Sequence, residues 1–386
     1  MAVKTNYNKN GNSYYRVTAT VGKDANGRYI RKEFYGKSKK EAEEKRDEYL
    51  ANIRAGLTAD YKEKLLGQCM HDWLFNVAKV KIKPSTFDRY EGIYRNYIKN
   101  TELTSLPLYS IKSIILQKHY NSLKELGKTS ASIRNLNKLL KTFFNYCINE
   151  DMMLKNPCNN IIIPGTAQEL AEKNIHPFSS DEINKIKAAS DGYDIDIIFL
   201  ILLGTGLRVG ELLAITENDI SFETKTITIS KNIKKVRDIV SDDSYEHKII
   251  IQTPKTENSV RIVPIPEPLI AVLKTHINKQ KIKHLSCGVP YDKNCLLFTT
   301  EFCNPLDGGN LRRAWERLLK RANVEHRGMH SIRHTYATKL FEAGVPIKTV
   351  SDLLGHSDIK VTTDIYVHVM AEVKTDAAEK LSFLFM

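Results

Sequence analysis

The sequence lacks the features that mark secreted, membrane-spanning or zinc-binding proteins. Its 386 residues include six cysteines, none of them in a C-x-x-C pair, so neither a disulfide framework nor a zinc site is expected. No charge-free apolar run approaches the ~18 residues that a membrane span needs, because Arg208 and Glu211 interrupt the nearest one, residues 196–214. The N-terminus has no apolar stretch typical of a signal peptide. We therefore expect a cytoplasmic protein with no membrane partner.

Motifs that bind nucleotides or paired metal ions are also missing. The glycines within residues 204–210 match neither the P-loop nor the dinucleotide-binding spacing. No Walker motif for ATP is present, and no carboxylate cluster suited to paired magnesium ions stands out. The sequence therefore predicts a protein that uses no cofactor and no metal.

Positive charge is plentiful but unevenly distributed along the chain. The net charge is +13. Residues 1–60 hold 13 Lys or Arg and 8 Asp or Glu, residues 61–160 hold 16 and 8, and residues 161–386 hold 29 of each. A basic surface can simply aid solubility. An excess confined to the first 160 residues instead favours contact with a polyanion such as the phosphate backbone of a nucleic acid.

Three regions differ in their residue patterns. Near the N-terminus, two runs of strand-forming residues, 14–21 and 28–35, flank a turn at Asp24–Gly27, which predicts a β-hairpin. Capping-box spacing from Ser38 predicts a helix that continues to about residue 55. Between residues 65 and 156, apolar residues recur at spacings of three and four, which predicts an all-α segment.

The third region combines helices with a few strands. Ser179 has the spacing of a helix start. Three strand-like runs follow, residues 226–230, 248–252 and 260–265, and we interpret the polar stretch 234–246 as a long hairpin loop. The expected fold class is therefore multidomain and mainly α. It comprises a small β-sheet with one helix, an all-α domain, and a mostly α domain with a small three-stranded antiparallel sheet.

Four short segments of the third region carry the candidate chemistry. They supply Arg208 with Glu211, then Lys255, then His330 with Arg333, and finally His356 followed ten residues later by Tyr366. Taken singly, each has an ordinary explanation. The first two residues can form a structural ion pair, and a lysine at a hairpin tip is usually only solvated.

Together, these residue types meet the needs of phosphoryl transfer without a metal. Two guanidinium groups can hold the non-bridging oxygens of a phosphate and neutralise the charge that grows in the transition state. A tyrosine hydroxyl, with an unperturbed pKa of about 10, becomes a nucleophile when a base and a cationic site assist it. Histidines can act as that base or as donors to the phosphate. A mobile lysine can protonate the departing 5′ oxygen.

The four segments resemble, in order and in local sequence, the tyrosine recombinase (phage integrase) family, and the motifs that carry the resemblance are TGLRVGELLAI, HSIRHTYAT and LLGHSDIKVTTDIYVHV. The resemblance implies a site-specific DNA recombinase that works through a 3′-phosphotyrosyl link. It is closest in layout to the integrases of conjugative transposons and temperate phages. It implies that Tyr366 is the nucleophile and that Glu211 supports the pocket without reacting. The activating pocket would consist of Arg208, Lys255, His330, Arg333 and His356.

The resemblance also assigns the remaining parts of the chain. Residues 1–60 would form an arm-type DNA-binding domain, residues 65–160 a helical core-binding domain, residues 161–176 a linker and residues 177–386 the catalytic domain. The implied partners are double-stranded DNA with core-type and arm-type sites, a homotetramer on that DNA, and an accessory excision factor or DNA-bending protein. The apolar tail, residues 372–386, is expected to pack either on a neighbouring subunit or on its own domain.

Two other functions fit some of these features. A DNA-binding accessory protein without catalysis would explain the basic N-terminal half but not the complete pocket. A type IB topoisomerase uses similar residues and chemistry. The arm-like domain and the short spacing between His356 and Tyr366 favour a recombinase. Strand exchange between two duplexes distinguishes the two enzymes, because DNA relaxation does not require it.

Overall fold

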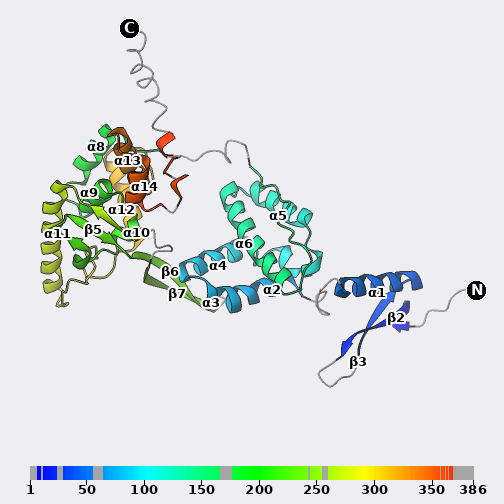
Figure 1. Cartoon of the computed structure of the whole chain (residues 1–386). Coiled ribbons are helices and arrows are strands. Elements are labelled where there is room, and N and C mark those ends of the chain that lie inside the picture. The colour runs from blue at the N-terminus through cyan, green and yellow to red at the C-terminus, as the bar shows by residue number, and fades with distance from the viewer. Residues whose placement is uncertain are drawn as a thin grey trace, which may run out of the picture. The chain divides into compact units, whose positions relative to one another are not determined.

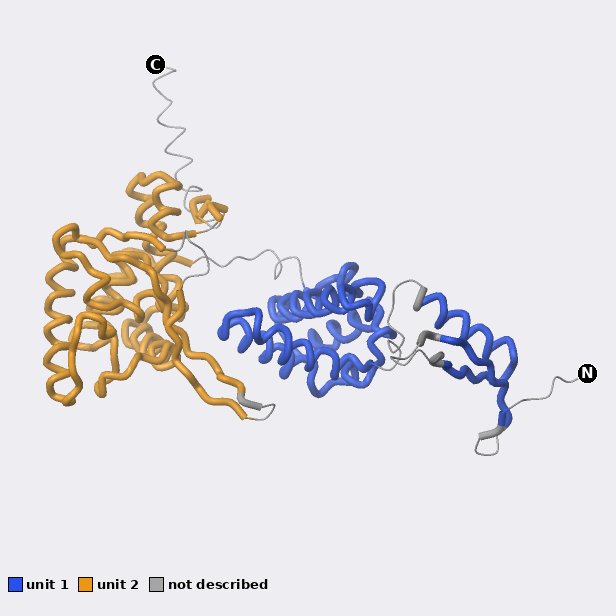
Figure 2. The backbone as a smooth tube through the Cα atoms, turned by 60° about the horizontal axis from the view of Figure 1, so that its bottom comes forward, with its two compact units in different colours: residues 1–172 blue, residues 173–386 orange. Residues whose placement is uncertain are grey.

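The computed structural model describes residues 7–9, 12–23, 29–54, 64–165, 176–241, 244–253, 260–356, 358–360, 362–363 and 365–367. The chain divides into two compact units, residues 1–172 and residues 173–386 (Figure 1, Figure 2). No helix in the described part of the chain combines the length and the apolar character that crossing a bilayer requires.

The N-terminal part of the first unit is a small antiparallel sheet covered by one helix. Strands β1 (Tyr7–Lys9), β2 (Asn12–Lys23) and β3 (Tyr29–Gly36) pair in that order, and α1 (Lys39–Arg54) follows. The Ser38 hydroxyl accepts a hydrogen bond from a backbone N–H of the first turn of α1, at 3.1 Å. The predicted hairpin and helix are therefore confirmed. The predicted turn, Asp24–Gly27, lies outside the described residues.

The rest of the first unit is helical, as its apolar periodicity predicts. Its elements are α2 (Leu66–Asp72), the π-helix η1 (Trp73–Ala78), α3 (Lys79–Lys81), α4 (Pro84–Tyr97), the 3-10 helices η2 (Glu102–Ser105) and η3 (Leu108–Ser110), α5 (Ser113–Glu125) and α6 (Ser130–Asn149). One face of α6 is buried along its whole length, through Ile133, Leu136, Leu139, Leu140, Phe143 and Phe144.

The chain that leaves α6 stays attached to the helices it has just formed. The Gln117 side chain exchanges two hydrogen bonds with the backbone of Ile162, at 2.8 and 2.9 Å. The Ser130 hydroxyl donates to the carbonyl oxygen of Pro164 at 2.7 Å. The first residues of the predicted linker are therefore held against α5 and α6.

The second unit is mainly helical and contains a small antiparallel sheet. Its helices are α8 (Ser180–Ser190), α9 (Ile195–Thr205), α10 (Val209–Leu212), η4 (Glu217–Asp219), α11 (Glu267–Ser286), α12 (Gly308–Arg321), α13 (His330–Glu342) and α14 (Ile347–Leu354). The sheet pairs β4 (Ile220–Ser221), β5 (Thr226–Ile229) and β8 (Arg261–Pro264) in that order. A capping box between Ser179 and Glu182 starts α8, as predicted. In the core, Trp315 packs against Phe199 with ring centroids 5.8 Å apart.

One interpretation from the sequence is wrong. The stretch 234–246 is not a loop, because β6 (Asn232–Ser241) and β7 (Ser244–Gln252) form a two-stranded antiparallel ribbon. The predicted strand 248–252 therefore belongs to this ribbon and not to the three-stranded sheet. Figure 2 shows the ribbon extending from the body of the second unit. A ribbon satisfies its backbone hydrogen bonds by strand pairing, so it tolerates charged residues that resemble a loop in composition.

Candidate active site

The first arginine is positioned by a glycine that ends α9. Gly206 has a φ of 63°, in the left-handed region, and its N–H bonds the carbonyl oxygen of Leu202 at 2.9 Å. Glycine adopts this conformation without the steric cost that other residues meet. The buried side chain of Leu207 then fixes the chain direction, and Arg208 becomes the residue that precedes α10.

A buried carboxylate joins Arg208 to a second arginine that the motifs did not indicate. Glu211 is 5% exposed, and its Oε1 lies 2.7 Å from Nη1 of Arg208. Its Oε2 lies 2.8 Å from Nη2 of Arg261. Burial alone would raise the pKa of the Glu211 carboxyl, but the hydrogen bonds and charges of Arg261 and Arg208 outweigh burial and lower it to about 2. The carboxylate is therefore ionised at neutral pH.

Arg333 lies on the inner side of α13 and is 2% exposed. Its Nη1 donates to the carbonyl oxygen of Gly206 at 2.7 Å, and its Nη2 donates to the carbonyl oxygen of Leu354. Its Nε is buried and has no hydrogen-bond partner among the described residues. Burial and the charge of Arg208 lower the pKa of the Arg333 guanidinium. This side chain connects the glycine turn after α9 to the C-terminal end of α14.

The two predicted histidines lie at the start of α13 and just after the end of α14. His330 is the first residue of α13, and its ring contacts that of His334 with centroids 4.8 Å apart. His356 follows Gly355, which ends α14 with a φ of 64°. The Nδ1 of His356 is 2.8 Å from the hydroxyl oxygen of Thr362.

Both histidines are neutral at physiological pH. Desolvation by the surrounding protein, followed by the charges of His334 and Arg333, lowers the pKa of His330 to about 4. Desolvation, followed by the charges of Arg333 and Arg208, lowers the pKa of His356 to about 3. A neutral imidazole can accept a proton through one nitrogen while it donates through the other.

Three successive carbonyl oxygens at the end of α14 each accept from a different arginine. Arg261 Nε donates to Leu353 at 2.8 Å, Arg333 Nη2 donates to Leu354, and Arg208 Nη2 lies 3.5 Å from the oxygen of Gly355. These are the carbonyls that a helix leaves without partners, and they carry the negative end of its dipole. The turn that precedes His356 is therefore fixed by positive charge.

Tyr366 packs beside the same two helices. Its ring meets that of Phe341 edge-on, with centroids 5.1 Å apart, and it covers a cluster formed by α13 and α14 that includes Val350 and Leu354. Among the described residues, no hydrogen bond joins Tyr366 to the arginines or histidines. Lys255 and the tail 372–386 lie outside the described residues, so their predicted roles stay predictions.

The structure thus brings Arg208, Arg333 and His356 together and adds Arg261, which sequence reasoning missed. The sequence of β8 gives no periodic signal for it, because Ile262, the next residue, is apolar yet 63% exposed; the burial pattern appears only in the structure. In β8, Arg261 and Val263 are buried while the residues between and after them are exposed. A charged residue at an inward position of a strand indicates a buried and paired charge.

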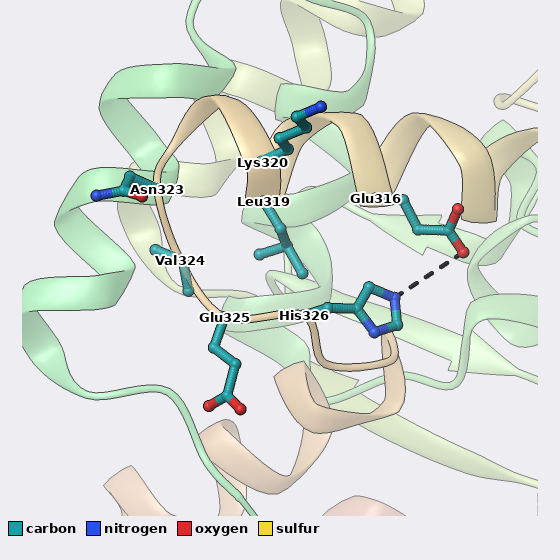
Figure 3. A pocket seen from close by; sticks show the side chains of 7 residues that line it. All are labelled: Glu316, Leu319, Lys320, Asn323, Val324, Glu325 and His326. Atoms are coloured by element: carbon teal, nitrogen blue, oxygen red, sulfur yellow. Dashed lines mark ion pairs between the residues drawn. The ribbon is translucent and has the colours of Figure 1, made fainter.

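Two hollows of the second unit are lined by other residues than the predicted site residues. Figure 3 shows one of about 340 Å³ at the end of α12, where Glu316 and His326 lie 3.9 Å apart at the surface. Both side chains are well exposed, which makes this a weak surface pair. A larger groove, of about 830 Å³, is lined by residues of α9, α11 and α12.

Comparison with known families shows which family this chain belongs to. The family described as "Phage integrase family" matches residues 176–372, which include all the predicted site residues. This chain belongs to the phage integrase family. A second family description, "Phage integrase, N-terminal SAM-like domain", matches residues 65–124. The predicted family is therefore confirmed, and this phage integrase family member is a tyrosine-type site-specific recombinase.

Similar proteins agree with this assignment. The "Tyrosine recombinase XerC-like" protein of Caldanaerobacter subterraneus is 51% identical over 391 residues, covering 100% of both chains. The "ICEBs1 integrase" of Bacillus subtilis is 24% identical, covering 97% of this chain and 98% of the relative. The transposase of transposon Tn916 from Enterococcus faecalis is 26% identical, covering 79% of this chain and 76% of the relative.

Solved structures show the same fold. The Tn1549 transposon integrase, solved with a circular intermediate DNA, superposes with a TM-score of 0.67 at 23% identity, covering 82% of this chain and 99% of that one. A lambda integrase dimer bound to a core site gives a TM-score of 0.57 at 17% identity, with 93% of each chain covered. The predicted fold class, mainly helical with small antiparallel sheets, is confirmed.

Proposed function

We propose that this recombinase cuts and rejoins DNA at specific sites of a mobile element. Its nucleophile is Tyr366, and its activating pocket consists of Arg208, Lys255, His330, Arg333 and His356. One observation carries the assignment. Arg208 and Arg333 come from separate elements and both donate to the turn that ends in His356. Two guanidiniums and a neutral imidazole at one turn suit a phosphodiester.

In the first step, the Tyr366 hydroxyl attacks the scissile phosphorus and the bond from phosphorus to the 5′ oxygen breaks. Arg208 and Arg333 hold the non-bridging oxygens and offset the charge of the transition state. The Nε of Arg333 is buried and has no hydrogen-bond partner among the described residues, so it bonds a phosphate oxygen once the site rearranges around the DNA. A neutral histidine, His330 or His356, accepts the tyrosine proton, and Lys255 gives a proton to the departing oxygen.

In the second step, the 5′ hydroxyl of the partner strand attacks the 3′-phosphotyrosine and releases Tyr366. Each step breaks one phosphate ester and forms another, so the bond energy is conserved and ATP is not needed. The two guanidiniums supply the positive charge that metal ions provide in other phosphoryl-transfer enzymes. The reaction therefore proceeds without a metal.

The partners follow from the same proposal. The substrate is double-stranded DNA, with residues 65–160 at the core-type site and residues 1–60 at an arm-type site. The concentration of positive charge in the first 160 residues supports this, as do the DNA complexes of the Tn1549 and lambda integrases. We further propose a homotetramer on DNA, an accessory excision factor or DNA-bending protein, and a cytoplasmic location.

A strand-exchange assay tests the function. Duplexes that bind the full chain are first selected from a random-sequence pool, and two labelled duplexes carrying the selected site are mixed with the protein. The proposal predicts products of recombinant length with the wild type and none with Tyr366→Phe. Relaxation of supercoiled DNA without exchange would indicate a topoisomerase. Tight binding without cutting or exchange would indicate an accessory protein.

A further inference from the structure

Arg261 occupies a position that no catalytic motif explains. It is the first residue of β8, and its side chain is 6% exposed, whereas that of Arg208 is 36% exposed. Burial of a charged side chain is costly unless it is paired and hydrogen-bonded. Arg261 meets both conditions, because its guanidinium faces both carboxylate oxygens of Glu211, at 2.8 and 3.3 Å.

The third donor of the same guanidinium reaches a different element. Arg261 Nε bonds the carbonyl oxygen of Leu353 at 2.8 Å, at the end of α14. The side chain also packs on the backbone of Gly355, because a Cβ there would lie 2.9 Å from Cδ of Arg261. Arg261 therefore joins Glu211 to the turn that immediately precedes His356.

The charges of Arg208, Arg261 and Glu211 indicate what the bridge formed by Arg261 contributes to the site. Arg208, Arg261 and Glu211 together carry one net positive charge. With Arg261 present, the Glu211 carboxylate is shared and buried, and the guanidinium of Arg208 keeps an exposed part. Without Arg261, Arg208 would be the only residue in the described part of the chain that forms an ion pair with Glu211, and the carboxylate would then neutralise the charge that Arg208 offers to a phosphate.

We propose that Arg261 is a positioning residue for DNA cleavage, which holds Glu211 and the Leu353–Gly355 turn so that Arg208 and His356 face one phosphate. The inference rests on the proposed roles of Arg208 and His356. All three nitrogens of the Arg261 guanidinium point at Leu353 and Glu211 and not at the solvent. Its effect therefore reaches the phosphate only through the residues that it holds.

The test uses the full chain and a nicked duplex carrying the selected binding site, so that the covalent adduct accumulates. Three quantities are measured for each variant: the Kd for the duplex, the rate of adduct formation between pH 5 and 9, and the melting temperature. The main variants are Arg261→Met and Arg261→Lys. Arg312→Met, which removes an exposed arginine from α12, is the control for loss of one positive charge.

For Arg261→Met we expect a Kd within about twofold of the wild type and adduct formation slower by about 10- to 100-fold, as when supporting residues of other reactive sites are removed. The pH profile should gain an acid limb, because Glu211 loses the partner that keeps its buried carboxyl ionised. Arg261→Lys should recover part of the rate. Arg312→Met should behave as the wild type.

A double variant distinguishes the loss of a positioning role from general misfolding. Arg261→Met combined with Glu211→Gln removes the buried charge together with its partner. If Arg261 acts through Glu211, this double variant melts higher than Arg261→Met and lacks the acid limb.

Wild-type rates in Arg261→Met would overturn the inference. So would parallel losses of binding, melting temperature and rate with an unchanged pH profile, since those describe a purely structural residue. If the wild type itself forms no adduct, the proposed function fails first and this inference fails with it.

Discussion

The ring of Tyr336 occupies the space in which a side chain on Gly206 would have to lie. A Cβ at Gly206 would come within 2.3 Å of Cδ1 of Tyr336, and the φ of Gly206 is 63°. The same glycine presents its carbonyl oxygen to Arg333. One glycine thus ends α9, accommodates an aromatic ring of α13 and holds the guanidinium of Arg333.

The variant Gly206→Ala is expected to lose both stability and cleavage. A left-handed alanine costs roughly 1–2 kcal/mol, and the contact with Tyr336 adds a further ~1–3 kcal/mol of overpacking. Gly344→Ala is the matched control, because Gly344 has a φ of 79° but a Cβ added there would meet no atom within 4 Å. Thermal unfolding and covalent-adduct assays compare the two. Equal losses in both variants would show that the ring contact is unimportant.

Arg208→Lys should separate folding from chemistry. Lysine keeps the charge but cannot hold two phosphate oxygens in the planar geometry of a guanidinium. Glu211 keeps its buried bond to Arg261, so the melting temperature should change little. The rate of adduct formation should fall by about 10²–10³-fold, as when a transition-state donor is lost. A rate within a few-fold of the wild type would show that Arg208 does not hold the phosphate.

The hydrogen bond between Thr362 and His356 is expected to orient the imidazole. Thr362→Val preserves the shape of the side chain but removes the oxygen that lies 2.8 Å from Nδ1 of His356. Adduct formation should slow by about tenfold, on the scale of orienting partners of histidines at other reactive sites. Thr363→Val is the control, because the Thr363 hydroxyl bonds the carbonyl oxygen of Ile359. The bond would be irrelevant if both variants cleaved equally fast.

The lowered histidine pKa values predict a particular pH dependence. With pKa values of about 4 and about 3, His330 and His356 stay neutral through pH 6.5. The cleavage rate should therefore show no inflection near pH 6.5, the ordinary histidine value. Single-turnover rates from pH 5 to 8 measure this. An inflection near pH 6.5 that His330→Gln or His356→Gln abolishes would contradict the neutral assignment.

The lowered pKa values of His330 and His356 also predict how the stability of the fold depends on pH. Below pH 6.5 the unfolded chain binds protons at these histidines that the folded chain does not bind. Stability therefore falls as the pH drops from about 6.5 towards the folded pKa values. The Glu211 carboxyl adds to this trend, because its lowered pKa contributes stability above about pH 4.5 that is lost as the pH falls towards 2. Melting temperatures between pH 4 and 8 should decrease on the acid side.

Local signals in the sequence predicted much of the fold. The periodicity of α6 indicated its buried face, and the spacing from Ser179 to Glu182 indicated the start of α8. Both depend on residues close together in the chain. The β6–β7 ribbon was missed, because its charged residues are compatible with strand pairing but do not indicate it.

Sequence motifs predicted the individual site residues, but they did not predict how the fold brings those residues together. Arg208 and Arg333 are separated by 125 residues in the chain, and only the fold shows that both reach the end of α14. Arg261 lacked a recognised motif, and its partners, Glu211 and Leu353, are distant in sequence. Tertiary hydrogen bonds of this kind leave no periodic trace in one sequence.

Covalent trapping tests the central claim most directly. The full chain is incubated in EDTA with a nicked duplex carrying its selected site, and denaturing gels compare the wild type with Tyr366→Phe and Tyr336→Phe. We expect a slow-migrating protein–DNA band with the wild type and its complete loss in Tyr366→Phe. Tyr336→Phe, whose ring remains against Gly206, should still form the band. A band that persists in Tyr366→Phe, or none with the wild type despite tight binding, would contradict the assignment of Tyr366 as the nucleophile.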